Sequence, residues 1–284
     1  MTISLPALVY KQRAASYSQT PTPPLRSDMA KQSYNIVVGA SGGIGSALAK
    51  HLENEPDAQL ITISRKRALP GINSHHFSYA PSPSHADRLE QNAKPLEAAI
   101  TACLDKIKAK LGQSLNIDRI FIATGVLHSS HFKPEKRLED LNELAATQVF
   151  QINSLLPILW CKHLYKICAT DNLTRLAVLS ARVGSIGDNH LGGWYSYRAS
   201  KAHLNMLLKT LSIELARRAK HISMFAVHPG TVDTELSKPF QQRVPSGKLF
   251  DSGQSAKYML TEIDARPHSS TLQFLDWQGK SIPW

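Results

Sequence analysis

The chain has 284 residues, of which 42% are hydrophobic, so it is long enough for one large α/β domain and short for two catalytic domains. Its formal net charge of +11 favours anionic ligands, but the basic residues are scattered and form no run with interleaved aromatics of the kind that binds nucleic acid. No stretch of about eighteen apolar residues occurs, which predicts no membrane-spanning segment. Three cysteines without CxxC spacing argue against a disulfide framework and fit a reducing, cytoplasmic compartment.

The first part of the chain differs in composition from the rest. Ser, Thr and Pro cluster between residues 16 and 24, so we expect residues 1–32 to be a disordered leader and residues 33–284 to form a single domain. An organellar transit peptide is the alternative, because basic residues precede the first acidic residue, Asp28. Met29 lies just before the first strand, which favours a plain tail or an over-extended start.

From residue 34 onward, apolar β-type runs alternate with segments of helical period. This pattern is typical of a parallel sheet covered by helices on both faces, so we expect a doubly wound α/β fold of the Rossmann type. The predicted strands are residues 34–39, 60–64, 120–123, 176–180, 222–228 and 272–274. The predicted helices are residues 44–53, 86–111, 145–167 and 197–218. Three prolines interrupt residues 65–85, where the only expected element is a short strand near residues 76–79.

A glycine-rich segment, Gly39-Ala-Ser-Gly-Gly-Ile-Gly45, follows the first predicted strand. Gly39 permits a sharp turn, Gly43 lets the backbone approach a pyrophosphate, and Gly45 allows tight helix packing. The exposed N–H groups of this turn, including those at Ser41 and Ile44, then face the phosphate. A flexible loop is the alternative, but the position between a buried strand and an amphipathic helix favours a nucleotide site.

The second predicted strand ends in Ser64 and Arg65, where a dinucleotide fold meets the adenosine ribose. An acidic residue there would accept hydrogen bonds from free ribose hydroxyls, whereas Arg beside Ser suits a 2′-phosphate. We therefore expect NADP as the cofactor and NAD as the less favoured alternative. A solvated basic turn is the interpretation without a cofactor.

Tyr197-Arg-Ala-Ser-Lys201 begins the last predicted helix, and positions four apart lie on one helix face. A tyrosine holds its proton to about pH 10, but a nearby cation stabilises the phenolate and shifts the pKa toward working pH. Tyr197 would then serve as general acid to a carbonyl oxygen, or as general base in the reverse oxidation. A surface pair is the alternative explanation.

Together the glycine spacing and the Tyr-x-x-x-Lys pattern resemble the short-chain dehydrogenase/reductase family, from residue 34 to about residue 280. The resemblance implies an NADP-dependent enzyme that reduces a small carbonyl compound or oxidises the matching alcohol, with Lys201 also holding the nicotinamide ribose. It further implies homodimers or homotetramers formed through the helices around residues 150 and 205. Three segments, residues 182–186, 192–197 and 277–284, are similar to the C-factor, or cell-to-cell signalling, branch of that family.

One position departs from the family pattern. The catalytic serine is expected as the second Ser of Ser-Ser-x-x-Gly, but the sequence reads Ser180-Ala-Arg-Val-Gly184, so Ala181 occupies its place. Alanine cannot donate the hydrogen bond that polarises a carbonyl, so Ser180 or Ser185 substitutes, or this step is weaker. Ser185 is preferred by a small margin, because strand alternation turns Ser180 away.

Asn153, in Gln151-Ile-Asn-Ser-Leu-Leu-Pro157, matches the family's proton-relay asparagine. Proline lacks an N–H, so Pro157 leaves the carbonyl of Asn153 without its usual helical donor, and that carbonyl can hold a water. In the family such a water links the lysine to bulk solvent, which we carry to Lys201. A buried asparagine at a helix kink is the alternative.

Two further stretches match the cofactor side of the family. Ala123-Thr-Gly125 stands in place of Asn-Asn-Ala-Gly, where the glycine leaves room for the cofactor. The segment His228-Pro-Gly-Thr-Val-Asp-Thr234 resembles the loop that packs on the nicotinamide, with contacts from Pro229, Gly230, Thr231, Val232 and Thr234. The family's usual Asp at the adenine is missing between residues 77 and 82.

Three other functions compete with that of an active enzyme: a regulatory protein, a nucleic-acid-binding module and a metal site. Ala181 and the resemblance to a signalling branch allow an NADP-binding regulatory protein with little turnover. A nucleic-acid-binding module would need a contiguous basic surface, and a metal site would need histidines at ligand spacing, so neither is expected. Leu191, Trp194 and Phe240 fall near the substrate side and either wall an apolar pocket or pack ordinarily.

Overall fold

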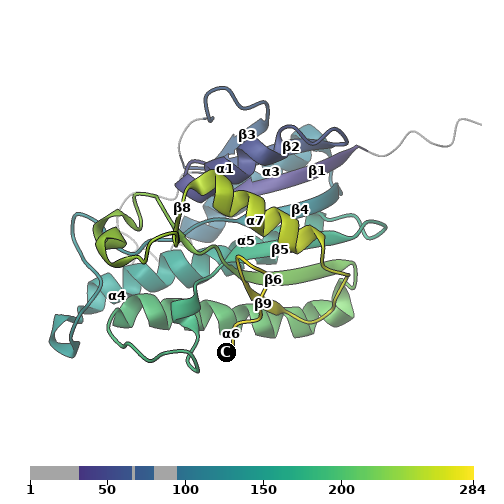
Figure 1. Cartoon of the computed structure of the whole chain (residues 1–284). Helices are drawn as coiled ribbons and strands as arrows, with labels where there is room; N and C mark the ends of the chain where they lie inside the picture. The colour runs from purple at the N-terminus through teal and green to yellow at the C-terminus, as the bar shows by residue number, and fades with distance from the viewer. Residues whose placement is uncertain (1–31, 66–67, 80–94) are drawn as a thin grey trace, which may run out of the picture. The chain divides into compact units, whose positions relative to one another are not determined.

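A parallel sheet of seven strands lies at the centre of the computed structural model, which describes residues 32–65, 68–79 and 95–284 (Figure 1). The strands are β1 (Ser33–Val38), β2 (Ala58–Ser64), β3 (His75–Ser78), β4 (Asn116–Ile122), β5 (Thr174–Leu179), β6 (Ile222–His228) and β9 (Gln273–Asp276). Their order across the sheet is β3-β2-β1-β4-β5-β6-β9. Successive strands are added on one side of β1 up to β3 and on its other side from β4 onward, and doubly wound sheets bind ligands at this switch point.

Helices cover both faces of this sheet, as the alternation in the sequence predicted. On one face lie α1 (Gly43–Leu52) and α7 (Ser252–Asp264); on the other lie α3 (Pro95–Leu111), α5 (Leu156–Leu164) and α6 (Tyr195–Arg218). Successive strand residues feed the two cores in turn: Ile120 and Ile122 pack under α3 and α5, whereas Phe121 packs under α1 and α7. The predicted fold class, a doubly wound parallel sheet, is confirmed.

Several predicted boundaries differ from the observed ones. β4 begins four residues before the predicted start, because the polar residues in its first half interrupt the apolar run from which the strand was predicted. One of them, Arg119, donates a hydrogen bond of 2.8 Å from its Nε to Asp264. The short strand expected near residues 76–79 is present as β3. Residues 1–31 of the predicted leader, which ends at residue 32, and residues 86–94 of the second predicted helix lie outside the described residues.

The helix predicted for residues 145–167 is broken into four pieces. They are α4 (Glu143–Phe150), a π-helical turn η2 (Gln151–Leu155), α5, and a 3-10 turn η3 (Tyr165–Ile167). Pro157 lacks the N–H that an α-helix would give to the carbonyl of Asn153, and the chain widens here so that the Leu156 N–H donates to the carbonyl of Gln151.

The segment from α4 to η3 also bears on the prediction that the chain has no membrane-spanning segment. Among the described residues, Glu143–Ile167 is the one helical segment long and apolar enough, by length and composition, to cross a membrane. Trp160, Cys161 and Leu164 of this segment are completely buried against the sheet, as in the core helix of a globular domain.

The sequence analysis did not predict α7, although its signals are present. The Asp251 side chain accepts a hydrogen bond from the Gln254 N–H at 2.8 Å and so caps the helix. Ala256, Met259 and Ile263 follow at helical spacing and are buried against α1. Five further short elements are present in the described residues: the 3-10 turns η1 (Leu138–Asp140), η4 (Arg182–Gly184) and η5 (Lys238–Arg243), and the strands β7 (Thr231–Val232) and β8 (Leu249–Phe250), which form a two-stranded sheet.

Candidate active site

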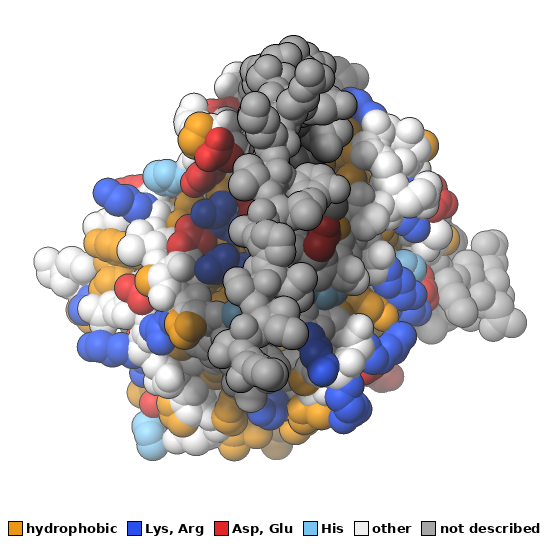
Figure 2. Space-filling view, turned by 90° about the vertical axis from the view of Figure 1, so that its right-hand side faces the viewer, with side chains coloured by type: hydrophobic (Ala, Val, Ile, Leu, Met, Phe, Trp, Pro, Cys, Tyr) orange, Lys and Arg blue, Asp and Glu red, His pale blue; other side chains and the backbone are white. Residues whose placement is uncertain are grey.

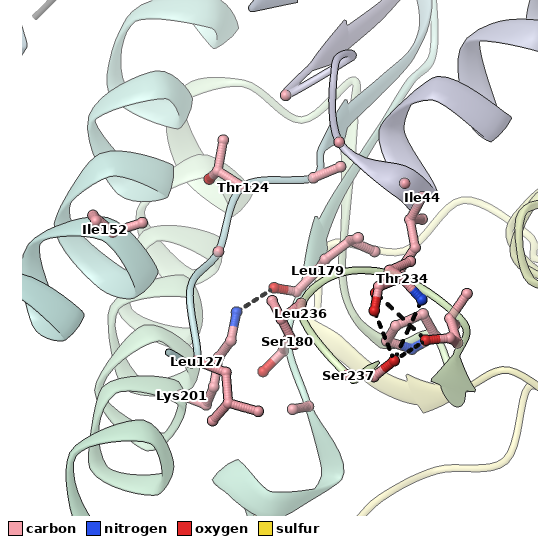
Figure 3. Close-up of a pocket in the computed structure, with 18 of the residues that line it drawn as sticks. Ile44, Thr124, Leu127, Ile152, Leu179, Ser180, Lys201, Thr234, Leu236 and Ser237 are labelled. Atoms are coloured by element: carbon pink, nitrogen blue, oxygen red, sulfur yellow. Dashed lines mark hydrogen bonds between the residues drawn. The ribbon is translucent and has the colours of Figure 1, made fainter. Parts of the chain in front are cut away.

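A cavity of about 1070 Å³ opens at the carboxyl ends of β1, β2, β4, β5 and β6. Most of the site residues predicted from the sequence line it: Gly39, Ser41, Gly43, Ile44, Ser64, Arg65, Ala123, Gly125, Ser180, Tyr197, Lys201, Pro229, Gly230, Thr231, Val232 and Thr234. Figure 3 shows Ile44 of the glycine loop next to Thr234, with Ile152 on the opposite wall and Lys201 beside Ser180. Gly45, Asn153 and Ser185 do not line the cavity.

The glycine loop is shaped by contacts that leave no room for side chains. Gly39 has a φ of 84°, and a Cβ there would lie 2.7 Å from the carbonyl oxygen of Ala123. A Cβ on Gly43 would clash with Thr234, and one on Gly45 would clash with the backbone of Gly39. Gly45 therefore acts behind the loop, by letting α1 pack against β1.

The amino end of α1 points at this cavity without a protein partner for its charge. Its N-cap, Gly42, offers no side-chain acceptor, and the first turn holds no acidic residue. The first amides of a helix have no intrahelical acceptor, and the helix dipole makes this end positive. An anionic group such as a pyrophosphate fits the cradle between Gly39 and Ile44.

The far end of the cavity is lined by Ser64 and Arg65 at the end of β2 and by Tyr79 after β3. Ser64 is buried, whereas Arg65 is exposed and its guanidinium is available to a ligand. Tyr79 is buried and meets Trp160 edge-on, with ring centroids 5.2 Å apart. The sequence analysis did not single out Tyr79, which occupies the region where the family's adenine-binding Asp was looked for.

Tyr197 and Lys201 both lie buried on α6 and line the opposite end of the cavity. The Lys201 Nζ donates to the carbonyl of Leu179 at 2.9 Å. Burial lowers the pKa of Lys201 to about 8 and raises the pKa of Tyr197 to about 12. The expected lowering of the Tyr197 pKa by Lys201 is absent from this structure: burial raises the pKa, and the Lys201 ammonium is bonded to the Leu179 carbonyl.

The structure separates the two candidate serines. Ser180 lines the cavity and donates its hydroxyl to the Asn205 Oδ1 at 2.6 Å. Ser185 is buried behind the turn, where its Oγ accepts from the Asp188 N–H at 3.1 Å. The expectation that Ser185 lies nearer to the substrate than Ser180 is therefore not met. Ala181 packs with Tyr197 in one small apolar cluster.

Asn153 is completely buried in the π-helical turn and joins two parts of the site. Its side chain accepts from the Val126 N–H and donates to the Val126 carbonyl, both at 2.8 Å. It also donates to the Ser200 Oγ at 3.0 Å. Asn153 thus fixes the loop after β4, which carries Gly125, against the helix that carries Tyr197.

Apolar side chains surround Tyr197 at the mouth of the cavity. Trp194 meets Tyr197 and Phe240 edge-on, with ring centroids 6.1 and 5.0 Å apart. Leu191, which was expected nearby, is 92% exposed and is not part of this wall. Leu127, Leu236 and Ser237 also line the cavity and were missed because they lie in loops without a readable pattern. Thr124 and Val183 line it as well, within motifs that were read for their neighbours.

The segment after β6 is anchored from α7 and β8. The Ser255 Oγ donates to the carbonyl of Pro229 at 2.8 Å, and Phe250 packs against Gly230, whose φ is 82°. β7 pairs with β8 and holds Thr231 and Val232 at the cavity. Among the residues that the structure describes, no group of three His, Cys, Asp or Glu side chains is placed to hold a metal ion.

A doubly wound sheet with a glycine cradle at its switch point and a Tyr–Lys pair across the same cavity defines a nicotinamide-dependent oxidoreductase. The family model for short chain dehydrogenases matches residues 34–245. The chain belongs to the short-chain dehydrogenase family, and it is an NAD(P)-dependent oxidoreductase that acts on small molecules.

Similar proteins place the chain within that family. The C-signal protein of Myxococcus xanthus is 31% identical over 147 residues, which are 52% of this chain and 83% of that protein. The 1-hydroxy-2-glutathionyl-2-methyl-3-butene dehydrogenase of Rhodococcus is 25% identical over 88% of this chain and 98% of that enzyme. An NADPH-bound carbonyl reductase from chicken fatty liver has the same fold, with a TM-score of 0.67 and 22% identity over 89% of this chain and 99% of that one. The predicted similarity to the C-factor branch is confirmed.

The buried charge of Lys201 predicts a pH-dependent stability. Its folded-state pKa, about 8, lies below the unfolded value of 10.5, so the unfolded chain binds more protons and this group destabilises the fold below pH 8. That destabilisation is relieved as pH rises through the window from 8 to 10.5. The variant Lys201→Met should therefore gain stability over the wild type at pH 7, and this gain should shrink by on the order of 1 kcal/mol at pH 9.5. Urea unfolding without cofactor measures both values, and a gain that does not change with pH contradicts the assignment.

Proposed function

We propose that the protein is an NADP-dependent oxidoreductase that reduces a carbonyl compound, or oxidises the matching alcohol, with Tyr197 as the proton donor. One observation carries the proposal: a single cavity joins the glycine cradle and Arg65 at one end to Tyr197 and Lys201 at the other. An extended dinucleotide reaches from the first end to the second only if its nicotinamide lies beside Tyr197.

The preference for NADP rests on Arg65. Its guanidinium lies at the end of β2, the strand that meets the adenosine ribose in this fold, and no acidic side chain lines that end of the cavity among the described residues. A guanidinium forms bidentate, charge-assisted hydrogen bonds with a phosphate. Two structural neighbours hold such a cofactor: the carbonyl reductase from chicken fatty liver binds NADPH, and a short-chain dehydrogenase/reductase from Burkholderia multivorans binds NADP.

Tyr197 is suited to donate a proton in the reducing direction. Burial raises its pKa to about 12, so the hydroxyl is protonated at neutral pH. When bound, the cofactor would supply or accept a hydride at its nicotinamide. Tyr197 protonates the carbonyl oxygen, and Lys201 is placed to hold the adjoining ribose and to stabilise the phenolate once the proton has left.

A second donor to the carbonyl oxygen is assigned to Ser180. Of the two candidate serines, Ser180 is the one that lines the cavity, and its hydroxyl can turn from Asn205 toward a substrate oxygen. Ala181 has no hydroxyl to offer, and Ser185 is held behind the turn by Asp188. The side chain of Asn153 links Val126 to Ser200 by hydrogen bonds. Its backbone carbonyl receives no hydrogen bond from Pro157, which has no N–H, and we assign the relay water to this carbonyl.

One observation favours a second candidate function. Ala181 lies against Tyr197, and the two nearby serines have their own partners, so the polarising hydrogen bond is weaker than in a complete active site. A protein that binds NADP and turns over slowly would serve as a regulator, in line with its 31% identity to the C-signal protein.

We also propose a homodimer or homotetramer. Figure 2 shows hydrophobic side chains along the lower edge of one face and lysines and arginines gathered on its right-hand side. Met206 and Ile213 of α6 are 65% and 50% exposed, and Leu155 beside α5 is 43% exposed, so a contact between subunits through these helices would bury apolar surface.

We further propose a cytoplasmic location. The three cysteines are free and buried, which accords with a reducing compartment.

The role of Tyr197 predicts the behaviour of Tyr197→Phe. Removing the phenolic proton should lower kcat for NADPH oxidation by at least about a hundredfold and leave NADPH binding nearly unchanged. The assay follows NADPH consumption with a panel of aldehydes, ketones and quinones, and binding is followed by thermal stabilisation. Tyr195→Phe, in the same helical turn but 41% exposed, is the matched control. Equal rates for Tyr197→Phe and the wild type would remove the proposal, whereas NADPH binding without turnover of any substrate would support the regulator.

The role of Arg65 predicts a change in cofactor choice. Arg65→Ala should weaken NADPH binding by roughly tenfold or more and leave NADH binding unchanged, because only NADPH carries the phosphate that the guanidinium contacts. Titration of each cofactor against protein fluorescence measures both constants. Lys50→Ala, which removes an exposed cation from α1, is the control for net charge. A tenfold preference of the wild type for NAD would contradict the role given to Arg65.

The serine assignment predicts unequal effects. Ser180→Ala should lower kcat by on the order of a hundredfold, because an oxyanion donor contributes about that much, while Ser185→Ala should change it little. Ala181→Ser, which puts a hydroxyl beside Tyr197, should raise kcat. Steady-state rates with the best substrate of the panel decide the matter, and a loss confined to Ser185→Ala would move the role to that residue.

A further inference from the structure

The amino end of α6 is built in an unusual way. Its N-cap, Trp194, has φ 54° and ψ 45° and is the single residue other than glycine with a positive φ in the part of the chain that the structure describes. The indole cannot accept a hydrogen bond from the first turn, so the cap that Ser, Thr, Asp or Asn would provide is missing from this position.

A buried carboxylate from another loop supplies what Trp194 lacks. Glu135, in the loop between β4 and α4, is 5% exposed. Its Oε2 accepts from the Ser196 N–H at 3.2 Å, and its Oε1 accepts from the Ser196 hydroxyl. Its backbone carbonyl accepts from the Trp194 N–H at 2.5 Å. One residue thus satisfies donors on both sides of the helix start.

These contacts hold Trp194 and Ser196, which precede Tyr197 at the start of the helix. The tyrosine directly follows Ser196, and its ring meets that of Trp194 edge-on. We propose that Glu135 is a positioning residue, which caps the catalytic helix from outside and holds the Tyr197 hydroxyl at the reacting carbonyl. The proposal rests on the proposed function of Tyr197 and adds a residue that no motif of the sequence points to.

The chemistry of the contact favours a carboxylate. Its negative charge faces the positive end of the helix dipole, and its two oxygens receive the amide and the hydroxyl of the same residue. The loop that delivers Glu135 also carries Gly125 and Leu127 to the cavity. Glu135 therefore couples the substrate side of the loop to the helix that carries the proton donor, and a shift of about 1 Å at such a site lowers rates by up to a hundredfold.

Two measurements on Glu135→Leu, Glu135→Gln and the control Glu139→Ala test the proposal. Glu139 lies in the same loop but is exposed. Hydrogen exchange of the 193–198 segment, read without substrate, should speed up at least tenfold in Glu135→Leu and not in the other two. Kinetics with the best carbonyl substrate should show kcat lowered by about tenfold or more in Glu135→Leu with KM for NADPH changed by less than about twofold. Glu135→Gln, which keeps an acceptor for the Ser196 amide, should recover most of kcat.

Other results overturn the proposal. A wild-type kcat in Glu135→Leu overturns it, whatever the hydrogen exchange of residues 193–198 shows. A loss that Glu135→Gln does not recover, or one in which kcat falls only as far as the folded fraction measured by urea unfolding, assigns Glu135 to stability alone. Failure of the proposed function itself would appear differently, as wild-type rates in Tyr197→Phe.

Discussion

The close approach of the glycine loop to the end of β4 is the contact on which the site depends. Gly39 packs so tightly on the carbonyl of Ala123 that a Cβ cannot be placed between them, and the Ala123 N–H donates to Val38 at 2.8 Å. Because the strand order reverses at β1 and β4, the connections on either side leave in opposite directions and open a crevice there. The loop and β4 thereby set both the floor of the cavity and the direction in which the amino end of α1 points.

The electrostatics of the cavity follow from burial without countercharges. Lys201 and Tyr197 lie in the same buried region, and each is driven toward its neutral form: the pKa of the lysine falls to about 8 and that of the tyrosine rises to about 12. A ligand with negative charge and ribose hydroxyls would favour the charged ammonium over the neutral amine. Such a ligand would raise the pKa of Lys201, so its binding and the uptake of a proton by Lys201 would be linked.

Those parts of the site that depend on local residue order could be predicted from the sequence. The glycine loop, Ser64 and Arg65, and the Tyr197 and Lys201 pair are each set by spacing within one loop or one helical turn, and all line the cavity except Gly45, which packs behind it. Parts that depend on long-range packing could not. The relative positions of Ser180 and Ser185 depend on partners on α6 and in the following turn, and burial reversed the expected shift of the Tyr197 pKa.

Glu135 illustrates why a cap supplied from a distance escapes sequence analysis. A capping residue is normally sought at the position just before its helix, where Trp194 offers no acceptor. The acceptor instead lies in Glu135, 61 residues before Ser196, whose N–H it receives. A non-glycine residue in the left-handed region persists only where its surroundings fix it, and here the Glu135 carbonyl and the rings of Phe240 and Tyr197 do so. The same strained start leaves position 194 free for an aromatic wall beside Tyr197, so the helix cap and the apolar mouth of the cavity are two consequences of one local arrangement.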